Sequence, residues 1–203
     1  MKIIAIGRNY IEHAKELNNP VPAEPVIFLM PETALIRNNK PFFYPDFSTD
    51  VHYEVELVIK IDKLGKNIAE KFAHRYYNEI GIGIDFTARD LQAILKNKGL
   101  PWEKAKAFDG AAPLGNFISK QELSNISNIS FSLEKNGETV QQGNSKDMIF
   151  SFDSIIESVS KYFTLKIGDL IYTGTPAGVG PVNIGDNLVA KIEGKELLKV
   201  QIR

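Results

Sequence analysis

Two glutamates and one aspartate are the residues of this chain best placed to do chemistry. Glu54 and Glu56 lie one residue apart in the apolar run 52–59, and Asp85 ends a second apolar run, 81–85. Side chains at positions i and i+2 of a strand point to the same face, about 6–7 Å apart. On an inward face, such like charges need a cation between them, and three carboxylates suit a hard divalent ion. The spacing therefore predicts a divalent-metal site.

A simpler interpretation of the same residues stays open at this point. The alternating apolar positions of the run are Tyr53, Val55, Leu57, Ile59 and Ile61. This alternation is typical of a half-buried strand, and on periodicity alone it favours Glu54 and Glu56 as part of a solvated outer face. Asp85 could instead cap a helix that begins at Thr87.

Length, charge and hydropathy narrow the classes of protein to which the chain could belong. Its 203 residues suit one domain with a sizeable core, so we expect a single domain over residues 1–203. A net charge of −1 provides no basic field, and no apolar run approaches the roughly 18 residues of a membrane span. We therefore expect neither nucleic acid nor a membrane as a partner. The apolar start, residues 1–7, is too short for a signal peptide, so we expect a cytoplasmic location.

The absence of cysteine limits the kinds of metal and redox chemistry available. Disulfides, iron–sulfur clusters and thiol nucleophiles are excluded. A metal site has to use carboxylates, carbonyls, water or the three histidines. That ligand set favours Mg²⁺ or Mn²⁺ over Zn²⁺.

The elements that would position these residues are mostly strands. The expected strands are residues 2–6, 26–30, 33–37, 52–61, 79–85, 112–118, 129–135, 138–142, 169–173, 187–192 and 196–202. The expected helices are residues 9–17, 69–77, 87–98 and 151–162. Asn136-Gly137 and Gly194-Lys195 predict hairpin turns. Because strands and helices do not alternate regularly, we expect a mainly β fold with peripheral helices (α+β), a sandwich or roll.

The predicted helix 9–17 places a histidine beside a glutamate. His13 and Glu16 are three residues apart and therefore share a helix face. A carboxylate beside an imidazole can act as a general base near neutral pH. An incidental pair on a surface helix is the alternative, and the spacing alone favours that alternative.

Polar and charged side chains in three further segments could bind an acidic substrate. Arg89 and Gln92 would project from the first turns of helix 87–98, where an arginine can bind a carboxylate or form an ion pair within the protein. Of the two lysines in 101–109, one could neutralise a three-carboxylate site, although lysines are more often solvated. The glycine- and proline-rich segment 172–181 could hold a substrate carboxylate or carbonyl through backbone amides and threonine hydroxyls, or it could be a plain turn.

Taken together, these motifs resemble those of one known family. They are Gly7-Arg8-Asn9-Tyr10 with His13 and Glu16, His52-Tyr53-Glu54-Val55-Glu56-Leu57, Asp85-Phe86-Thr87-Ala88-Arg89-Asp90-Leu91-Gln92, Gly99-Leu100-Pro101-Trp102, Ala105-Lys106, Thr173-Gly174-Thr175-Pro176 and Gly178-Val179-Gly180-Pro181. The chain resembles the fumarylacetoacetate hydrolase family, and within it the compact acylpyruvase and oxaloacetate decarboxylase-like members. The resemblance runs nearly from end to end.

The resemblance implies roles for particular residues. It implies a β-sandwich or roll like the family's C-terminal domain, with an N-terminal lid over about residues 9–25, and a homodimer. The implied metal ligands for Mg²⁺ or Mn²⁺ are Glu54, Glu56 and Asp85. The implied catalytic residues are His13, Glu16 and Lys106. The implied substrate-binding residues are Arg89, Gln92 and Thr175.

The resemblance also implies a small-molecule 2-oxo acid as substrate. The activity expected first is metal-dependent hydrolysis of a C–C bond in acylpyruvates (2,4-dioxo acids), which yields pyruvate and a carboxylic acid. The alternatives are oxaloacetate decarboxylation or tautomerisation, hydration or isomerisation of 2-oxo-enoic acids, and metal binding without catalysis. The pair His13–Glu16 favours hydrolysis, because decarboxylation does not require a water-activating pair.

Overall fold

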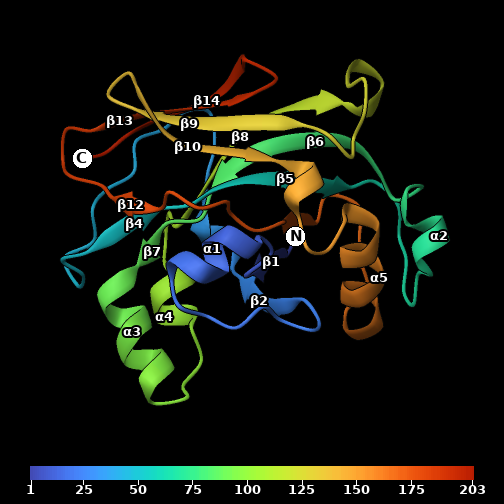
Figure 1. Ribbon diagram of the computed structural model, residues 1–203, viewed down its shortest axis with the longest axis horizontal. Helices are drawn as coiled ribbons and strands as arrows, with labels where there is room; N and C mark the ends of the chain where they lie inside the picture. The colour runs from blue at the N-terminus through green and yellow to red at the C-terminus, as the bar shows by residue number, and fades with distance from the viewer.

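The computed structural model describes residues 1–203, and strands dominate it (Figure 1). The strands are β1 (Ile3–Gly7), β2 (Val26–Met30), β3 (Leu35–Ile36), β4 (Val51–Tyr53), β5 (Val55–Ile61), β6 (Tyr77–Ile84), β7 (Thr87–Ala88), β8 (Ala112–Ser119), β9 (Ser130–Lys135), β10 (Glu138–Asn144), β11 (Leu170–Tyr172), β12 (Gly180–Pro181), β13 (Asn187–Ile192) and β14 (Lys195–Gln201). The helices are α1 (Ile11–Glu16), α2 (Glu70–Ala73), α3 (Arg89–Asn97), α4 (Glu103–Lys106) and α5 (Phe152–Tyr162). Short 3₁₀ turns lie at Glu32–Ala34, Lys120–Glu122 and Ser145–Asp147.

The strands form one large curled sheet and two smaller ones. The large sheet has the order β2-β1-β11-β5-β6-β8-β3, and the four-stranded sheet β10-β9-β13-β14 lies over it at the top of Figure 1. Strands β13 and β14 contact β6, and β14 also contacts β8. A small sheet, β12-β4-β7, lies at the left of the view, and the helices lie outside the sheets. The mainly β roll with peripheral helices is thereby confirmed.

Strand β5 is buried on both faces, which decides the environment of the glutamates. It is hydrogen-bonded to β11 on one edge and to β6 on the other. Leu57 and Ile59 belong to the main hydrophobic core, whereas Val58 on the other face packs in a second cluster; all three are fully buried. Strand β5 therefore has no solvated face of the kind that alternation alone favours.

Several element boundaries differ from the predicted ones for identifiable reasons. The predicted strand 52–61 is interrupted at Glu54 and continues as β5. The predicted helix 87–98 begins only at Arg89, because residues 87–88 pair with β4. The predicted helix 69–77 is shortened to α2, and its predicted last residue, Tyr77, is instead the first residue of β6. Helix α4 and the short strands β7 and β12 were not predicted from the pattern.

Both predicted hairpin turns are present, one of them displaced. Asn136 and Gly137 both have positive φ, +54° and +87°, as a two-residue turn between β9 and β10 requires. In the C-terminal hairpin the positive values fall on Glu193 and Gly194, one residue earlier than predicted.

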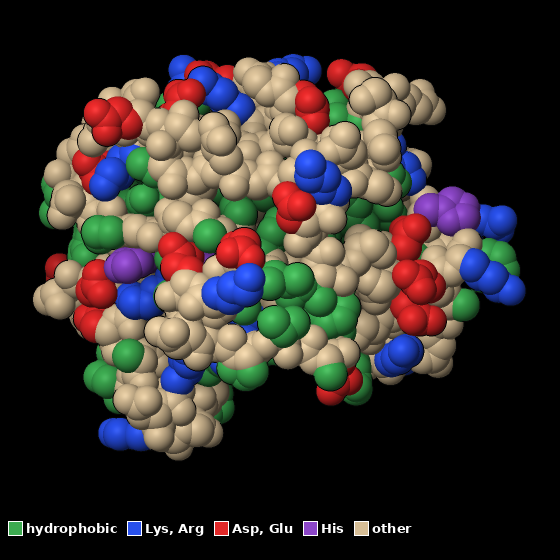
Figure 2. All heavy atoms as spheres, in the orientation of Figure 1, with side chains coloured by type: hydrophobic (Ala, Val, Ile, Leu, Met, Phe, Trp, Pro, Cys, Tyr) green, Lys and Arg blue, Asp and Glu red, His purple; other side chains and the backbone are tan.

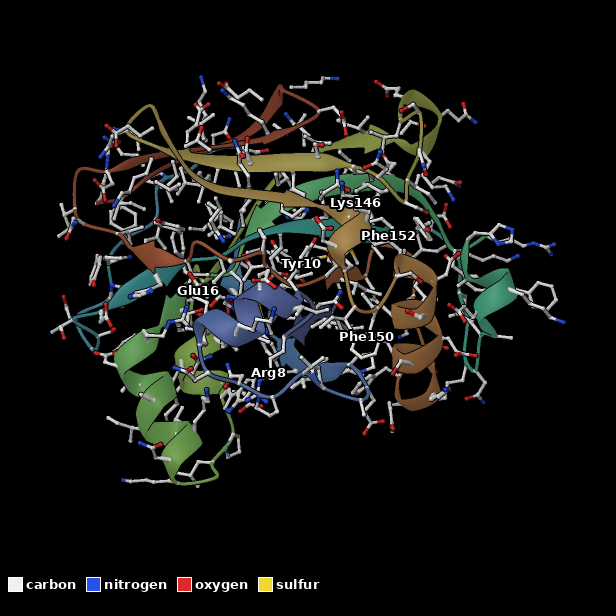
Figure 3. The ribbon with its side chains drawn as sticks, viewed as in Figure 1. Arg8, Tyr10, Glu16, Lys146, Phe150 and Phe152 are labelled. Carbon is white, nitrogen blue, oxygen red and sulfur yellow. The ribbon has the colours of Figure 1, made fainter.

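Helix α1 is tied to the body of the protein by the residues that precede it. The amide of the fully buried Asn9 donates to the carbonyls of Phe150 and Thr173, and its side-chain oxygen accepts from the Phe150 N–H. Tyr10 packs edge-on against Phe131 of β9. Figure 3 shows Tyr10 on the side of α1 that faces β9 and β10, and Arg8 on the opposite side.

The visible surface carries side chains of both charges, and the helices are short. Acidic and basic side chains are interspersed over the face shown in Figure 2. None of the five helices has the length and apolar character that crossing a bilayer demands.

Candidate metal centre and surrounding cavity

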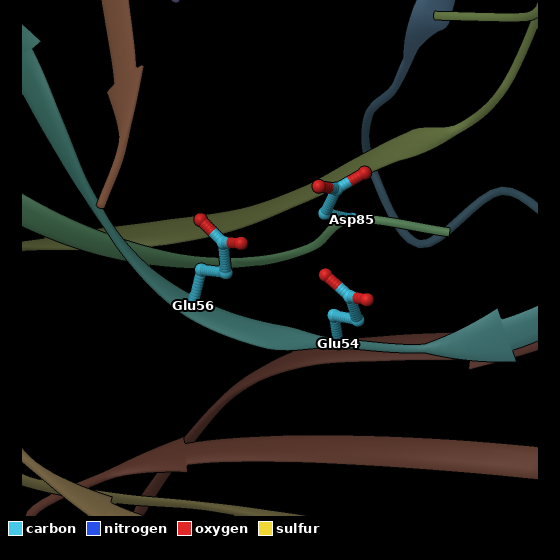
Figure 4. Close-up of side chains that lie close together, drawn as sticks. All are labelled: Glu54, Glu56 and Asp85. Carbon is cyan, nitrogen blue, oxygen red and sulfur yellow. The ribbon is translucent and has the colours of Figure 1, made fainter. Parts of the chain in front are cut away.

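The three predicted carboxylates converge on one point inside the protein. Strand pairing places Asp85 beside the start of β5, where its N–H donates to the carbonyl of Glu54 over 2.8 Å. One oxygen from each of Glu54, Glu56 and Asp85 lies within 4.8 Å of the others, and Figure 4 shows the side chains directed toward one another. Their exposed fractions are 5%, 2% and 1%. The interpretation of the glutamates as a solvated face is therefore wrong.

Two cationic side chains form ion pairs with this acidic cluster. The Lys106 ammonium donates to Glu54 Oε2 over 2.8 Å and to Asp85 Oδ2 over 2.6 Å, and it also contacts Thr87 Oγ1 at 2.6 Å. The Arg89 guanidinium donates to Glu54 Oε1 over 2.6 Å and to the Gln92 amide oxygen over 2.7 Å. Lys106 is itself buried, with 4% of its surface exposed. Of the two lysines in the segment 101–109, Lys106 therefore neutralises the site, whereas Lys104 is exposed.

The cap proposed as an alternative for Asp85 is wrong, whereas the ion pair within the protein proposed as an alternative for Arg89 is present, with Glu54 as its partner. Helix α3 has no side-chain cap, and its preceding residue is Ala88. Asp85 interacts with Lys106 instead of capping the helix. Asp90 accepts from Ser48 and from the Thr49 N–H, so Arg89 is left to pair with Glu54.

Burial and neighbouring charges shift the pKa values of the three carboxyl groups in different directions. Burial raises the pKa of Asp85 from 3.8 to about 7, against the opposing effect of Lys106, with a further rise from Glu54. Burial, followed by the charge of Asp85, raises the pKa of Glu56 well above its ordinary value. Burial also acts to raise the pKa of Glu54, but Lys106 and Arg89 outweigh it and hold this pKa below the ordinary range. Two of the three carboxyls therefore favour a proton unless a cation replaces it.

The donor set fits a hard divalent ion. Three carboxylates face two cationic side chains, which leaves a negative charge for an ion to balance. Asp85 Oδ1 is buried and has no hydrogen-bond partner, which is costly for a carboxylate oxygen unless a ligand meets it. All the available donors are oxygens, as Mg²⁺ and Mn²⁺ prefer. The residues present therefore suit the ion that the sequence predicts.

The histidine of the predicted base pair and all three predicted substrate contacts line the same cavity. The cavity is lined by Ile6, Gly7, Arg8, His13, Leu17, Asn19, Phe28, Glu54, Glu56, Asp85, Arg89, Gln92, Lys96, Trp102, Lys106 and Thr175. His13 Nδ1 lies 3.1 Å from Glu16 Oε2, and His13 is buried. The other oxygen of Glu16 accepts from the Gly178 N–H over 3.0 Å. Glu16 thus orients the imidazole and ties α1 to the segment 172–181.

The segment after β11 supports the acidic cluster through its backbone. The Gly174 N–H donates to Glu56 Oε2 over 2.8 Å. Gly174 has φ +97°, and a Cβ there would come within 2.7 Å of the Asn9 Cβ, so this position requires glycine. The interpretation of 172–181 as a plain turn therefore omits its contact with the acidic cluster.

Gln141 is a supporting residue that the sequence did not reveal. Its amide oxygen accepts from the Val55 N–H over 2.9 Å, and its amide nitrogen donates to Thr175 Oγ1 over 3.0 Å. Gln141 thereby joins the start of β5 to the segment that carries Thr175. No local signal distinguishes it from its neighbour Gln142, because glutamines in a predicted strand are ordinary. Thr87, which the sequence places at the start of a helix, contacts Lys106.

The fold and the site define a β-rich protein in which a buried cluster of three carboxylates lines a cavity. The family model of the fumarylacetoacetate (FAA) hydrolase C-terminal domain matches residues 2–203, and the chain belongs to this family. It is 43% identical over 197 residues to the oxaloacetate tautomerase YcgM of Escherichia coli, covering 97% of this chain and 90% of the relative. It is 42% identical over 194 residues to a mitochondrial oxaloacetate decarboxylase of Dictyostelium discoideum, covering 95% and 89%.

A solved structure with bound metal is similar to the whole chain. It is the fumarylpyruvate hydrolase of Pseudomonas aeruginosa in complex with Mn²⁺ and pyruvate. The TM-score is 0.93 at 33% identity, with 100% of this chain and 89% of that chain covered.

Divalent metal should stabilise the protein in a pH-dependent way. Because the pKa of Asp85 is raised in the folded state, the metal-free protein should lose stability as pH rises from about 4 to about 7. Mg²⁺ favours the ionised carboxyls, so it should raise the melting temperature by several degrees at pH 8 and by much less at pH 5. Thermal unfolding at both pH values with Mg²⁺, and with K⁺ at equal ionic strength as control, measures this. An equal shift at the two pH values would contradict it.

Proposed function

We propose that this protein interconverts the keto and enol forms of oxaloacetate at a site that holds Mg²⁺ or Mn²⁺. The identities of 43% and 42% to an oxaloacetate tautomerase and an oxaloacetate decarboxylase, each over nearly the whole chain, support oxaloacetate as the substrate. Decarboxylation of oxaloacetate is the second candidate, on the strength of the second of these relatives. Acylpyruvate hydrolysis, the first expectation from the sequence, draws support from a relative that is only 33% identical.

The observation that carries the proposal is the shared cavity. His13 lines the same cavity as the three carboxylates and Lys106. Keto–enol interconversion requires a base for a carbon-bound proton and a positive environment for the oxygen that becomes an enolate. This cavity offers both.

His13 and Glu16 are proposed to move the proton. The carboxylate of Glu16 forms a hydrogen bond with Nδ1 of His13, so Nε2 is the ring nitrogen that can meet a substrate. The carboxylate of Glu16 fixes the orientation of the ring and stabilises the imidazolium that forms when Nε2 takes up a proton. This role needs no attacking water, so the pair does not favour hydrolysis over tautomerisation.

Lys106, Arg89, Gln92 and Thr175 are proposed to bind and polarise the substrate. Burial lowers the pKa of Lys106, but Asp85 and Glu54 outweigh it and raise this pKa, so the ammonium stays charged beside the developing oxyanion. A divalent ion held by Glu54, Glu56 and Asp85 would supply further electrostatic stabilisation of that charge. Arg89 and Gln92 are joined by a hydrogen bond and present their polar groups to the cavity together.

The N-terminal segment 9–25 is proposed to act as a lid. The cavity measures only about 40 Å³, which is room for roughly three water molecules. Oxaloacetate has nine heavy atoms, so it needs more space than this conformation offers. Since His13 and Leu17 of this segment line the cavity, an outward movement of α1 would admit the substrate.

Parallel assays of two substrates test the proposed function. The purified protein with Mg²⁺ should accelerate the loss of enol-oxaloacetate absorbance, and excess chelator should abolish this acceleration. Release of CO₂ from oxaloacetate, measured in the same samples, reports decarboxylation. Cleavage of acetylpyruvate, followed by pyruvate formation, reports hydrolysis. Rapid cleavage of acetylpyruvate without any effect on enol-oxaloacetate would contradict the proposal and support acylpyruvate hydrolysis instead.

Removal of the histidine should slow tautomerisation strongly. We expect His13→Gln to lower the rate constant by about 10²–10⁴-fold, because glutamine cannot take up the proton. Binding of Mn²⁺, measured by calorimetry, should be largely unchanged, since the hydrogen-bond partner of His13 is Glu16 and not Glu54, Glu56 or Asp85. His74→Gln is the matched control, because His74 lies at the end of α2, outside the cavity. Unchanged tautomerisation in His13→Gln would remove the pair from the mechanism.

Two further expectations stay predictions. The homodimer is proposed on the resemblance to the family. The cytoplasmic location stays an expectation, and the relatives include a bacterial protein and a mitochondrial one.

A further inference from the structure

A second group of cationic side chains lines the cavity and takes no part in the metal centre. Arg8 follows β1, and Lys96 lies near the end of α3. Neither contacts Glu54, Glu56 or Asp85, which are held by Lys106 and Arg89. The proposed mechanism therefore leaves both cations without a function.

These two cations also lack a carboxylate partner elsewhere in the protein. The Arg8 guanidinium forms neither a side-chain hydrogen bond nor an ion pair; it lies over the Trp102 ring, 6.0 Å from its centroid. The Lys96 ammonium donates only to the neutral Asn19 Oδ1, over 2.9 Å. Burial, and then the charges of Arg8 and Arg89, lower the pKa of Lys96, which places the three positive groups close enough to repel one another. Such repulsion is relieved when an anion binds among them.

Arg8 is held in position by its neighbours. Its φ of +60° is unusual for a residue other than glycine. The conformation is maintained because β1 ends immediately before it and the three hydrogen bonds of Asn9 fix the chain immediately after it. Trp102 supports the guanidinium and packs edge-on against Phe28. The side chain that faces the cavity is therefore preorganised, and strained backbone of this kind is common where a ligand is held.

The charge of the cavity favours more than one anionic group in the substrate. Four cationic side chains and three carboxylates line it. A divalent ion at the carboxylates would add two further positive charges. A 2-oxo acid with a neutral tail brings one carboxylate, which would leave Arg8 and Lys96 uncompensated. A second carboxylate at the far end of the substrate would compensate one of these two charges and could lie between both side chains.

We propose that Arg8 and Lys96 bind the distal carboxylate of the substrate and so select dicarboxylic 2-oxo acids over those with a neutral tail. This rests on the proposed function, which it deepens by assigning specificity to two residues. Arg8 is the main contact, because its planar guanidinium can bind a carboxylate through two hydrogen bonds. Lys96 is exposed and contributes less.

A matched pair of unreactive ligands tests the proposal independently of catalysis. Malate and lactate are both 2-hydroxy acids and differ in the distal carboxylate. Calorimetry with saturating Mg²⁺ should show that the protein binds malate at least about 10-fold more tightly than lactate. Arg8→Gln should weaken malate binding about 10–100-fold and change lactate binding less than about 2-fold. Lys96→Gln should weaken malate binding about 2–5-fold.

Three further measurements make the result decisive. Lys98→Gln removes the same charge from the exposed residue after α3, outside the cavity, and should leave the malate-to-lactate ratio unchanged. Arg8→Lys should retain part of the preference if Arg8→Gln folds poorly. In Arg8→Gln the KM for oxaloacetate should rise more than kcat falls. Equal weakening of malate and lactate, or an unchanged ratio, would overturn the proposal.

Failure of the inference can be told apart from failure of the proposed function. A protein that tautomerises oxaloacetate but whose malate preference survives Arg8→Gln refutes only the role of Arg8. A protein that leaves oxaloacetate unchanged but loses its malate preference in Arg8→Gln refutes only the reaction.

Discussion

Asp85→Asn should abolish tight divalent-metal binding and lower kcat/KM for oxaloacetate by at least about 10³-fold. Asparagine has nearly the shape of aspartate, so the packing is kept while one of three anionic ligands is lost. Electrostatic stabilisation by a bound ion contributes several kcal/mol to a transition state, and this is the stabilisation at risk. Mn²⁺ calorimetry and initial rates across a range of Mg²⁺ concentrations measure the two effects.

A surface carboxylate on β6, the strand that ends immediately before Asp85, provides the control. Glu79 lies on β6 and pairs with Lys60 at the surface, with 41% of its side chain exposed. Glu79→Gln should leave metal binding and kcat/KM within about 2-fold of the wild type, because exposed ion pairs contribute little. Full turnover of Asp85→Asn in excess chelator would show that the carboxylate cluster is not the metal centre.

Lys106→Met should lower kcat by about 10²–10³-fold and destabilise the metal-free protein. The ammonium lies between Glu54 and Asp85, and methionine leaves two buried carboxylates without this partner. Removal of one member of a buried ion pair costs about 3–5 kcal/mol, whereas the loss of a positioned charge at an oxyanion costs about 2.7–4 kcal/mol in the transition state. Denaturant unfolding with and without Mg²⁺, together with steady-state rates, separates the two contributions.

The divalent ion itself provides a sharp test of this account of Lys106. Mg²⁺ should recover much of the lost stability in Lys106→Met, because it supplies positive charge to the same carboxylates, but it should not restore kcat. Lys104→Met is the matched control, since Lys104 lies exposed on the same short helix. A Lys106→Met protein with wild-type kcat would exclude the ammonium from stabilising the oxyanion.

Much of the fold could be predicted from the sequence because its signals are local. Alternating apolar residues, the Asn136-Gly137 turn and the helical spacing of Ile155, Ile156 and Val159 each depend on neighbours within a few positions. The predictions were wrong where pairing with a strand far away in the sequence determines the structure. Residues 87–88 join a strand instead of a helix because β4 lies beside them, and no property of the two residues signals that neighbour.

The spacing of Glu54 and Glu56 determined that their side chains share a face, but not whether that face meets water. On periodicity alone, solvation was the better interpretation, and it was the resemblance to a known family that favoured the metal site. Only the tertiary structure decided the matter, since β6 and β11 enclose β5 and bring Lys106 and Arg89 to the glutamates.

The types and spacing of its acidic residues, its lack of cysteine and its motifs were sufficient to indicate an oxygen-ligand metal site and a family. The sequence did not indicate that Gln141, Arg8 and Lys96 belong to the site, because the groups near each of them come from distant parts of the chain. The sequence specifies which side chains are present and how they are spaced. Their burial, their pKa values and the balance of charge in a cavity arise only when distant segments pack together.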